Sequence, residues 1–177
     1  MAKRPFGPLV SGKVRLRPLE ERDLPLTLAW RNQDHIRKWF FTSSVITPER
    51  HAAWFQSYRE RDDDFVFIIE DLSAHGRSAG QVALYRVDWA GRRAEFGRLM
   101  IGEPAAAGRG LAKAATQALV TGAFADLGLN EVYLEVMAEN HRARAIYERC
   151  DFSVTGVRDG VVLMARKREG AVAACAE

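Results

Sequence analysis

The sequence predicts a single α/β (α+β) domain built from about seven strands and about four helices. Two patterns support this prediction. Short apolar or alternating runs, typical of strands, are separated by longer segments in which apolar residues recur with helical spacing. A third observation is size, because the 177 residues, 47% of them apolar, suffice for one domain with its own core.

Strands are expected where apolar residues alternate or form a short continuous run. The run at 65–69 is continuous and is expected at the centre of the sheet. The other expected strands cover residues 14–17, 79–88, 93–101, 131–138, 152–157 and 161–166. The last two should form a hairpin through Asp159 and Gly160, because Asp-Gly is typical of a tight β-turn.

Helices are expected at residues 24–32, 48–60, 111–127 and 141–150, with a short helical piece at 36–40. Three polar residues precede these segments, and we expect them to cap the helices: Asp23, Thr47 and Asn140. Gly128 is expected to end the helix that starts at residue 111.

The domain is expected to cover residues 13–168. Residues 1–12 are expected to form a flexible lead and residues 169–177 a flexible tail. No stretch has the roughly 20 apolar residues of a membrane span, and the basic N-terminus lacks the apolar core of a secretory signal. The two cysteines, Cys150 and Cys175, do not indicate a disulfide, so a cytoplasmic location is expected.

The net charge of +3 and the isoelectric point near 9.1 suit an anionic ligand. The first 22 residues are basic, but they contain no interleaved aromatic residues and no nucleic-acid-binding motif. We therefore expect neither a nucleic-acid partner nor a membrane partner. The four histidines are scattered and do not have the spacing of metal ligands, so no metal is expected.

A glycine turn follows the expected strand at 93–101 and opens the expected helix at residue 111. It consists of Ala107, Gly108, Arg109, Gly110, Leu111 and Ala112. Glycines let the backbone approach a ligand closely, and a helix N-terminus presents free N–H groups that favour an anion. The turn therefore predicts a phosphate-binding site.

A second motif lies about 30 residues further on and consists of Asn140, Ala143, Tyr147, Glu148, Asp151 and Phe152. With the glycine turn and the order of elements, it resembles the GCN5-related N-acetyltransferase (GNAT) family over residues 14–167. Two positions depart from the family pattern. Ala107 occupies a position where the family has Arg or Gln, and Asp151 occupies one where it has Gly. The resemblance implies a mixed, mostly antiparallel sheet and acetyl-CoA as the co-substrate, bound by the glycine turn.

The resemblance also implies roles for individual residues. Tyr147 would donate a proton to the departing thiolate, although the same residue could be only a half-buried core aromatic. Asn140 would hydrogen-bond the cofactor arm as well as cap its helix. The backbone of Leu99, Met100 and Ile101 would pair with the pantetheine amides like an added strand.

Two residues are candidates for the base that accepts the proton of the amine. Glu95 lies in a strand among apolar residues, where burial could raise its pKa. Its alternative role is an ion pair with Arg92 or Arg93. His51 has a suitable intrinsic pKa, but it could instead simply pack on Trp54.

The N-terminal half contains Trp30-Arg31-Asn32, Ile36-Arg37-Lys38-Trp39, Ile46, His51 and Trp54-Phe55. With these residues it resembles the nucleotide-sugar N-acetyltransferases of the pseudaminic-acid pathway. This resemblance implies an acceptor site made by Trp30, Arg31, Asn32 and Arg37. The two arginines would bind acceptor phosphates, provided that the helix breaks between residues 32 and 34 to let them converge. Each of these residues has an alternative role that involves no acceptor. Trp30 could simply pack in the core, and the two arginines could be ordinary solvated charges.

The sequence thus predicts an acetyl-CoA-dependent N-acetyltransferase, a monomer or homodimer, that acts on a small-molecule amine. The favoured acceptor is a nucleotide-linked amino sugar. A polyamine or the N-terminus of a ribosomal protein is the alternative acceptor, since spermidine and ribosomal-protein alanine acetyltransferases share the run from Ala94 to Ala112. A non-catalytic acyl-CoA-binding sensor is the alternative of another class.

Overall fold

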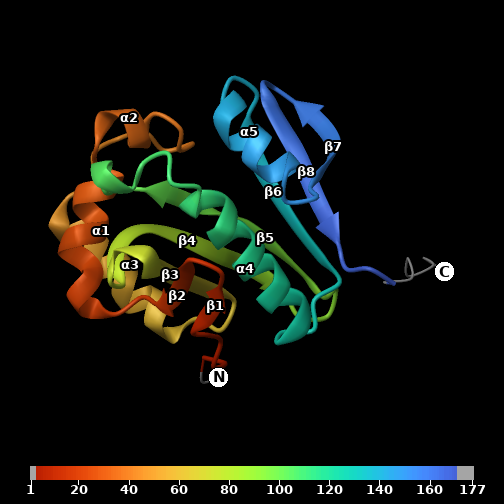
Figure 1. Ribbon diagram of the computed structural model, residues 1–177, viewed down its shortest axis with the longest axis horizontal. Coiled ribbons are helices and arrows are strands. Elements are labelled where there is room, and N and C mark those ends of the chain that lie inside the picture. Colours follow the sequence, from red (N-terminus) through yellow and green to blue (C-terminus); the bar gives the residue numbers. More distant parts are fainter. Residues whose placement is uncertain (1–2, 171–177) are drawn as a thin grey trace.

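The computed structural model describes residues 3–170, and within them eight strands form one sheet in the order β1-β2-β3-β4-β5-β6-β8-β7 (Figure 1). The strands are β1 (Leu9–Ser11), β2 (Val14–Pro18), β3 (Asp64–Asp71), β4 (Arg77–Asp88), β5 (Arg93–Ile101), β6 (Glu131–Met137), β7 (Ser153–Arg158) and β8 (Val161–Lys167). All neighbours are antiparallel except β5 and β6, so the expected mixed, mostly antiparallel sheet is confirmed.

Five α-helices flank the sheet within the same residues. They are α1 (Leu24–Arg31), α2 (Asp34–Arg37), α3 (Pro48–Glu60), α4 (Leu111–Ala125) and α5 (His141–Glu148). Short 3₁₀ turns precede α1, follow β3 and follow β5. No helix in the described range is long and apolar enough to cross a membrane.

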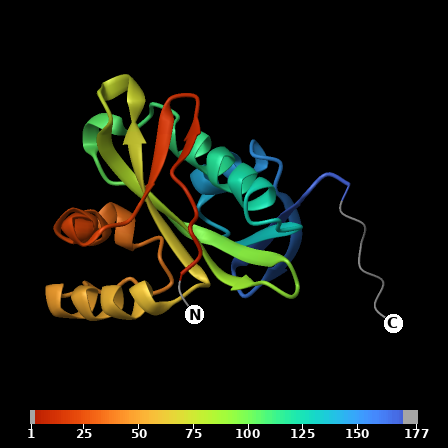
Figure 2. The same cartoon turned by 90° about the horizontal axis from the view of Figure 1, so that it is seen from below.

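The sheet separates two cores. Figure 2 shows α1 and α3 on one side of the sheet and α4 on the other. The larger core lies between the sheet and α4 and α5, and it includes Phe67, Phe96 and Leu119. The smaller core lies under α1 and α3 and includes Trp30 and Ile68. Because β3 is covered on both faces, all eight of its residues are buried, which explains its continuous apolar run.

Strands β5 and β6 are paired over only part of their length. Their parallel register covers Arg93–Glu95 of β5 and Glu131–Tyr133 of β6. Beyond these residues β5 continues to Ile101 and β6 to Met137 without pairing with each other. The sheet therefore opens after Glu95, and one edge of the later part of β5 is left without a strand partner.

The N-terminal lead differs from expectation. Residues 9–11 form β1, which pairs with β2, and the ring of Phe6 is buried against Phe65 and Phe67 with centroids 5.4 Å away from each. The prediction of a flexible lead is therefore wrong for residues 6–11. Of the expected flexible tail, residues 171–177 lie outside the described residues, as does Cys175. Cys150 is buried and unpaired.

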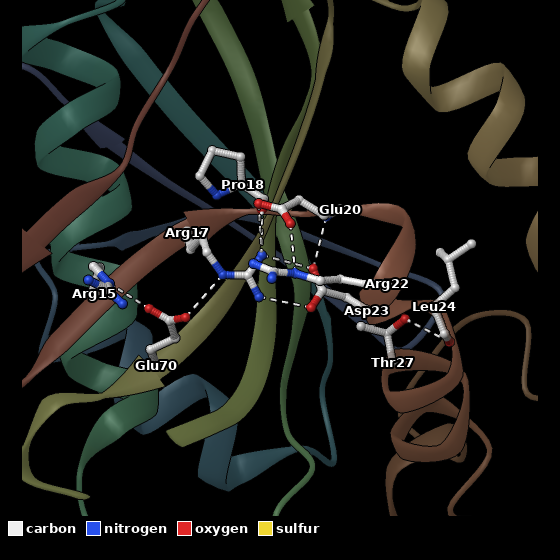
Figure 3. Close-up of polar contacts among 9 residues, drawn as sticks. All are labelled: Arg15, Arg17, Pro18, Glu20, Arg22, Asp23, Leu24, Thr27 and Glu70. Carbon is white, nitrogen blue, oxygen red and sulfur yellow. Dashed lines mark hydrogen bonds and ion pairs between the residues drawn. The ribbon is translucent and has the colours of Figure 1, made fainter. Parts of the chain in front are cut away.

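The start of α1 is fixed by an ion-pair network on β2 (Figure 3). The guanidinium of Arg17 bonds Asp23 at 2.8 and 3.0 Å and Glu70 at 3.0 Å, and Arg15 bonds the other oxygen of Glu70. Asp23 does not cap α1 as expected, because its side chain accepts these bonds and the Glu20 backbone N–H. Burial opposes ionisation of Asp23, but these hydrogen bonds hold its pKa below its usual range.

Other local expectations are confirmed. Thr47 caps α3 and Asn140 caps α5, each accepting a backbone N–H bond. Asp151 follows α5 at the position where the family has glycine. It has φ +63°, the left-handed conformation that glycine adopts most easily. Asp159 and Gly160 have φ +49° and +77° in the β7–β8 turn. The expectation for Gly128 is wrong: α4 ends at Ala125 with Asp126 as its C-cap, and Gly128 (φ +67°) lies two residues further on.

Candidate active site

The glycine turn leads directly into α4. Gly108 and Gly110 have φ +76° and +74°, a conformation that only glycine adopts without strain, and Gly110 is the N-cap of the helix. A methyl group on Gly108 would meet nothing within 4 Å, so the turn is open on that side. The first N–H groups of a 15-residue helix therefore point out of an accessible turn, which suits a phosphate.

Two cations hold this turn. Arg109 forms an ion pair with buried Asp71 at 2.9 Å and donates to Ser73 Oγ at 2.8 Å. The Lys13 ammonium donates to the Arg109 carbonyl and would lie 3.1 Å from a methyl group on Gly110. Sequence reasoning missed Lys13, since it lies in the β1–β2 turn, 96 residues from its acceptor.

From the glycine turn, β5 runs back toward the opening of the sheet. A bulge interrupts its pairing with β4, because Gln81 pairs with Met100 and Ala83 with Gly97. Arg98 and Leu99 therefore lie opposite the single residue Val82, and Arg98 has φ +50°. A strand rises about 3.3 Å per residue, so Glu95 lies roughly 20 Å from Ile101, which is within the length of an extended cofactor arm.

Tyr147 lies at that opening, on the α4 side of the sheet. Its ring packs edge-on against Phe96 (centroids 5.8 Å apart) and against Phe152 (6.0 Å). Burial is the main reason that its pKa is raised above the usual value. The hydroxyl makes no hydrogen bond to another residue in the described chain and stays protonated at neutral pH.

Glu95 lies at the same opening on the other face of β5, since neighbouring strand residues point to opposite faces. Its side chain is buried and accepts hydrogen bonds from Tyr85 at 2.9 Å and from Arg86 at 2.7 Å. The expected ion-pair alternative thus exists, but with Arg86 rather than with Arg92 or Arg93. Glu95 and the contact between Phe96 and Tyr147 therefore lie on opposite faces of β5, at two successive residues of the strand.

A pocket of about 270 Å³ opens on the face of Glu95, between β5, α1, α3 and the 38–47 loop. Its wall combines apolar, hydroxyl and basic side chains: Thr27, Arg31, Phe40, Thr42, Ile46, Arg50, His51, Trp54, Gln81, Arg98 and Met100. We call it the acceptor pocket. No carboxylate lines it among the described residues.

His51 lies in the wall of the acceptor pocket. Its ring stacks on Trp54, with centroids 5.2 Å apart, and its Nε2 lies 3.0 Å from Thr27 Oγ1. Burial lowers its pKa below the usual value, so the imidazole is neutral at neutral pH. His51 packs on Trp54 and also lines the pocket, so this position is compatible with a packing role and with a role as the base.

Of the residues expected to bind the acceptor, Arg31 alone lines the acceptor pocket. Trp30 is 2% exposed and packs against Gly102, so its expected role in binding is wrong and core packing is correct. Asn32 is bonded to both backbone groups of Ile46. Arg37 bonds Asp34 and the Ser43 carbonyl. The helix does break between Arg31 and Asp34 as required, but Asn32 and Arg37 shape the 38–47 loop instead of lining the pocket.

The described residues contain no cluster of side chains that could hold a metal ion. The site instead joins an open glycine turn at a helix N-terminus, an unpaired strand edge and a pocket on the other face of the sheet. An anionic cofactor with a long amide-bearing arm fits the first two features, and a second substrate fits the third. Together they define a transferase that uses a coenzyme A thioester.

Comparison with known proteins identifies the family. The model of the acetyltransferase (GNAT) domain matches residues 13–153, so this chain belongs to the GNAT family. The chain is 31% identical to the spermidine N(1)-acetyltransferase of Escherichia coli (strain K12) over 143 residues, which cover 81% of this chain and 74% of the relative. It is 30% identical to YdaF of Bacillus subtilis (strain 168), named as a ribosomal N-acetyltransferase, over 157 residues (86% and 85%).

A solved structure agrees. Spermidine N-acetyltransferase from Vibrio cholerae in complex with CoA and spermine superposes with a TM-score of 0.80 at 25% identity, covering 89% of this chain and 96% of that chain. The chain is thus an acetyl-CoA-dependent N-acetyltransferase of the GNAT fold. A dodecameric structure of the Vibrio cholerae enzyme is 23% identical to this chain (TM-score 0.71, coverage 89% and 95%), so a monomer or homodimer here stays a prediction.

These relatives correct one expectation. Their names describe polyamine and ribosomal acceptors, and they give no support to the resemblance with the pseudaminic-acid-pathway enzymes.

Proposed function

We propose that this enzyme transfers the acetyl group of acetyl-CoA to a primary amine held in the acceptor pocket, by direct attack in a ternary complex. Glu95 acts as the base, through water, and Tyr147 as the proton donor. The proposal depends mainly on one observation: Glu95 and Tyr147 flank β5 on opposite faces where β5 and β6 separate. The acceptor pocket lies on the Glu95 face of the sheet and α4 on the Tyr147 face, and neither Glu95 nor Tyr147 is among the residues that line the pocket.

The chain supplies what amide formation needs. Acetyl-CoA brings the acetyl group as a thioester. The attacking amine must lose a proton, and the buried Glu95 carboxylate can accept it through water, since its bonds to Tyr85 and Arg86 fix its orientation. The departing thiolate needs a proton, which the Tyr147 hydroxyl can donate. The backbone of Leu99, Met100 and Ile101 holds the cofactor arm along the free edge of β5, while Asn140 is the further candidate to bond that arm.

The proposal leaves the chemical identity of the acceptor amine to be determined. The relatives favour a polyamine, which makes polyamine acetylation the second candidate. The acceptor pocket opposes it, because a polycation would enter a wall that carries three arginines and no carboxylate among the described residues.

The test is the release of CoA from acetyl-CoA in the presence of a panel of amines, including spermidine and a peptide that begins with alanine. Amine-dependent release, with the acetylated amine detected by mass spectrometry, is the expected result. Tight binding of acetyl-CoA with no release by any amine would contradict the proposal and favour a non-catalytic acyl-CoA sensor.

A further inference from the structure

The acceptor pocket contains a buried arginine, Arg31, that forms no ion pair with a carboxylate of the described residues. Arg31 is 8% exposed, and one of its terminal nitrogens, Nη2, donates to the Thr42 carbonyl. The other, Nη1, is buried and has no hydrogen-bond partner among the described residues. The guanidinium carbon lies 4.0 Å from the centroid of the Phe40 ring, and no carboxylate of the described residues forms an ion pair with this arginine.

This situation is unusual because burying an unpaired charge is costly. Two half-buried arginines have carboxylate partners: Arg17 has Asp23 and Glu70, and Arg98 has Asp64. Arg144 is also half-buried and forms no ion pair among the described residues, but Arg31 is the more deeply buried of the two. Burial and the nearby charge of Arg37 both lower the pKa of Arg31, as expected for a cation without a counter-ion.

The rest of the pocket suits an anion at the same place. Arg50, on the first turn of α3, also lines the pocket and has no ion pair among the described residues. Arg98 also lines it, but its charge is compensated by Asp64. The apolar surfaces of Trp54 and Met100 are available for a short carbon chain.

We propose that Arg31 and Arg50 bind an anionic group, a carboxylate or a phosphate, on the amine that this enzyme acetylates. The inference rests on the proposed function and narrows its acceptor to amines that carry a negative charge a few atoms from the nitrogen. It separates this chain from a polyamine acetyltransferase, since a polyamine brings only positive charges to the same arginines.

Two matched pairs of acceptors test the inference. Phosphoethanolamine is compared with ethanolamine, and 4-aminobutyrate with its amide, at equal concentrations of free-base amine. The first pair tests a phosphate and the second a carboxylate. Because bonds between charged partners are strong, kcat/KM should be about 10- to 100-fold higher for the anionic member of at least one pair. Spermidine should be a poorer acceptor than that member.

Variants of Arg31 and Arg50 test whether these residues cause the preference for an anionic acceptor. Arg31→Gln and Arg50→Gln should each reduce the ratio of kcat/KM between the anionic and the uncharged member by about tenfold or more. Arg31→Lys should keep part of the preference, because the charge remains but the planar fork is lost. Arg59→Gln is the matched control, since this exposed arginine is also on α3 but outside the acceptor pocket.

Three results would overturn the inference: no preference in wild type, spermidine as the best acceptor, or an equal loss for both members in Arg31→Gln. If no amine releases CoA, the proposed function fails, and binding decides the inference separately. Calorimetry of the CoA-saturated protein with phosphoethanolamine, 4-aminobutyrate and their uncharged partners should still show tighter binding of an anionic member that is lost in Arg31→Gln. Equal or absent binding would overturn it.

Discussion

The ring of Tyr147 meets the ring of Phe96 edge-on, at an interplanar angle of 78° and a centroid distance of 5.8 Å. This contact links α5 to the β5 residue that directly follows Glu95. The phenol ring is therefore held by the core, while its hydroxyl makes no bond to another described residue. In the proposed mechanism the ring of Tyr147 supplies the packing and its hydroxyl supplies the proton.

Replacing Tyr147 by Phe should therefore slow turnover without unfolding the protein. The ring contacts with Phe96 and Phe152 remain, and only the proton donor is lost. A positioned acid contributes typically 100- to 10,000-fold, and we expect a loss of about that size in single-turnover experiments. A variant within about twofold of wild type would show that another group protonates the thiolate.

The raised pKa of Tyr147 also predicts the pH profile. A phenol whose pKa lies above its ordinary value keeps its proton throughout the neutral and mildly alkaline range. The rate should therefore show no falling limb up to about pH 10 from loss of this proton. A falling limb near pH 8 that disappears in Tyr147→Phe would contradict this assignment.

Glu95→Gln should lower kcat/KM by about 100-fold or more at neutral pH, because an amide cannot accept the proton of the amine. His51→Gln should cost less than about tenfold, since the imidazole contributes to the wall of the pocket rather than to proton transfer. Arg86→Gln removes the charge partner that helps to orient Glu95 and should lower kcat/KM less than Glu95→Gln does. A larger loss in His51→Gln than in Glu95→Gln would reverse the assignment of the base.

Gly110→Ala should weaken acetyl-CoA binding by about tenfold or more, measured by calorimetry, because its methyl group would lie 3.1 Å from the Lys13 ammonium in the turn that presents the first N–H groups of α4. The left-handed conformation also strains any residue other than glycine by about 1–2 kcal/mol. Gly160→Ala is the matched control, since it has the same conformation (φ +77°) in the β7–β8 turn. It should lower stability similarly and leave affinity unchanged; equal loss of affinity in both variants would refute a phosphate site at the turn.

Asp64→Asn should destabilise the fold by about 3 kcal/mol in urea denaturation, because it leaves the Arg98 guanidinium without its charge partner. Asp64 is 1% exposed and accepts three bonds from Arg98, at 2.8, 3.1 and 3.1 Å. Asp63→Asn tests the neighbouring carboxylate, which pairs with Arg61 near the surface, and should cost less than about 1 kcal/mol. Similar losses in both variants would mean that burial of the Arg98 pair adds nothing.

Much of this arrangement follows from local sequence. The alternation of residues predicts β6, the run at 65–69 predicts the buried strand β3, and Asn140 predicts the start of α5. These features depend on side-chain period and capping, which act within one element. The glycine turn was predictable for the same reason, since two glycines before an apolar periodic segment determine the backbone there.

The wall of the acceptor pocket depends instead on contacts between distant segments. Trp30 and Arg31 are neighbours in α1, yet one enters the core beside Gly102 and the other faces the pocket. Asn32 reaches Ile46 across the 38–47 loop, and no periodicity in the sequence predicts the path of that loop. β1 was missed because three residues beside glycines and a proline resemble a flexible lead, while their partner surface lies on β2 and α4.

The packing of β1 against α4 has a consequence for this helix, which follows the glycine turn. Gly122, in the interior of α4, lies where any larger side chain would collide with Leu9, at 2.8 Å from its first added atom. A glycine there weakens an isolated helix by about 1 kcal/mol, so α4 gives up intrinsic stability for close approach of the N-terminal hairpin. The folding unit thus begins before residue 13, where the family match starts. A chain shortened to that point would lose Phe6 and Leu9 and expose the part of α4 around Gly122, far from the proposed phosphate site at the start of the helix. A loss of acetyl-CoA affinity in such a chain would therefore arise at the opposite end of the helix.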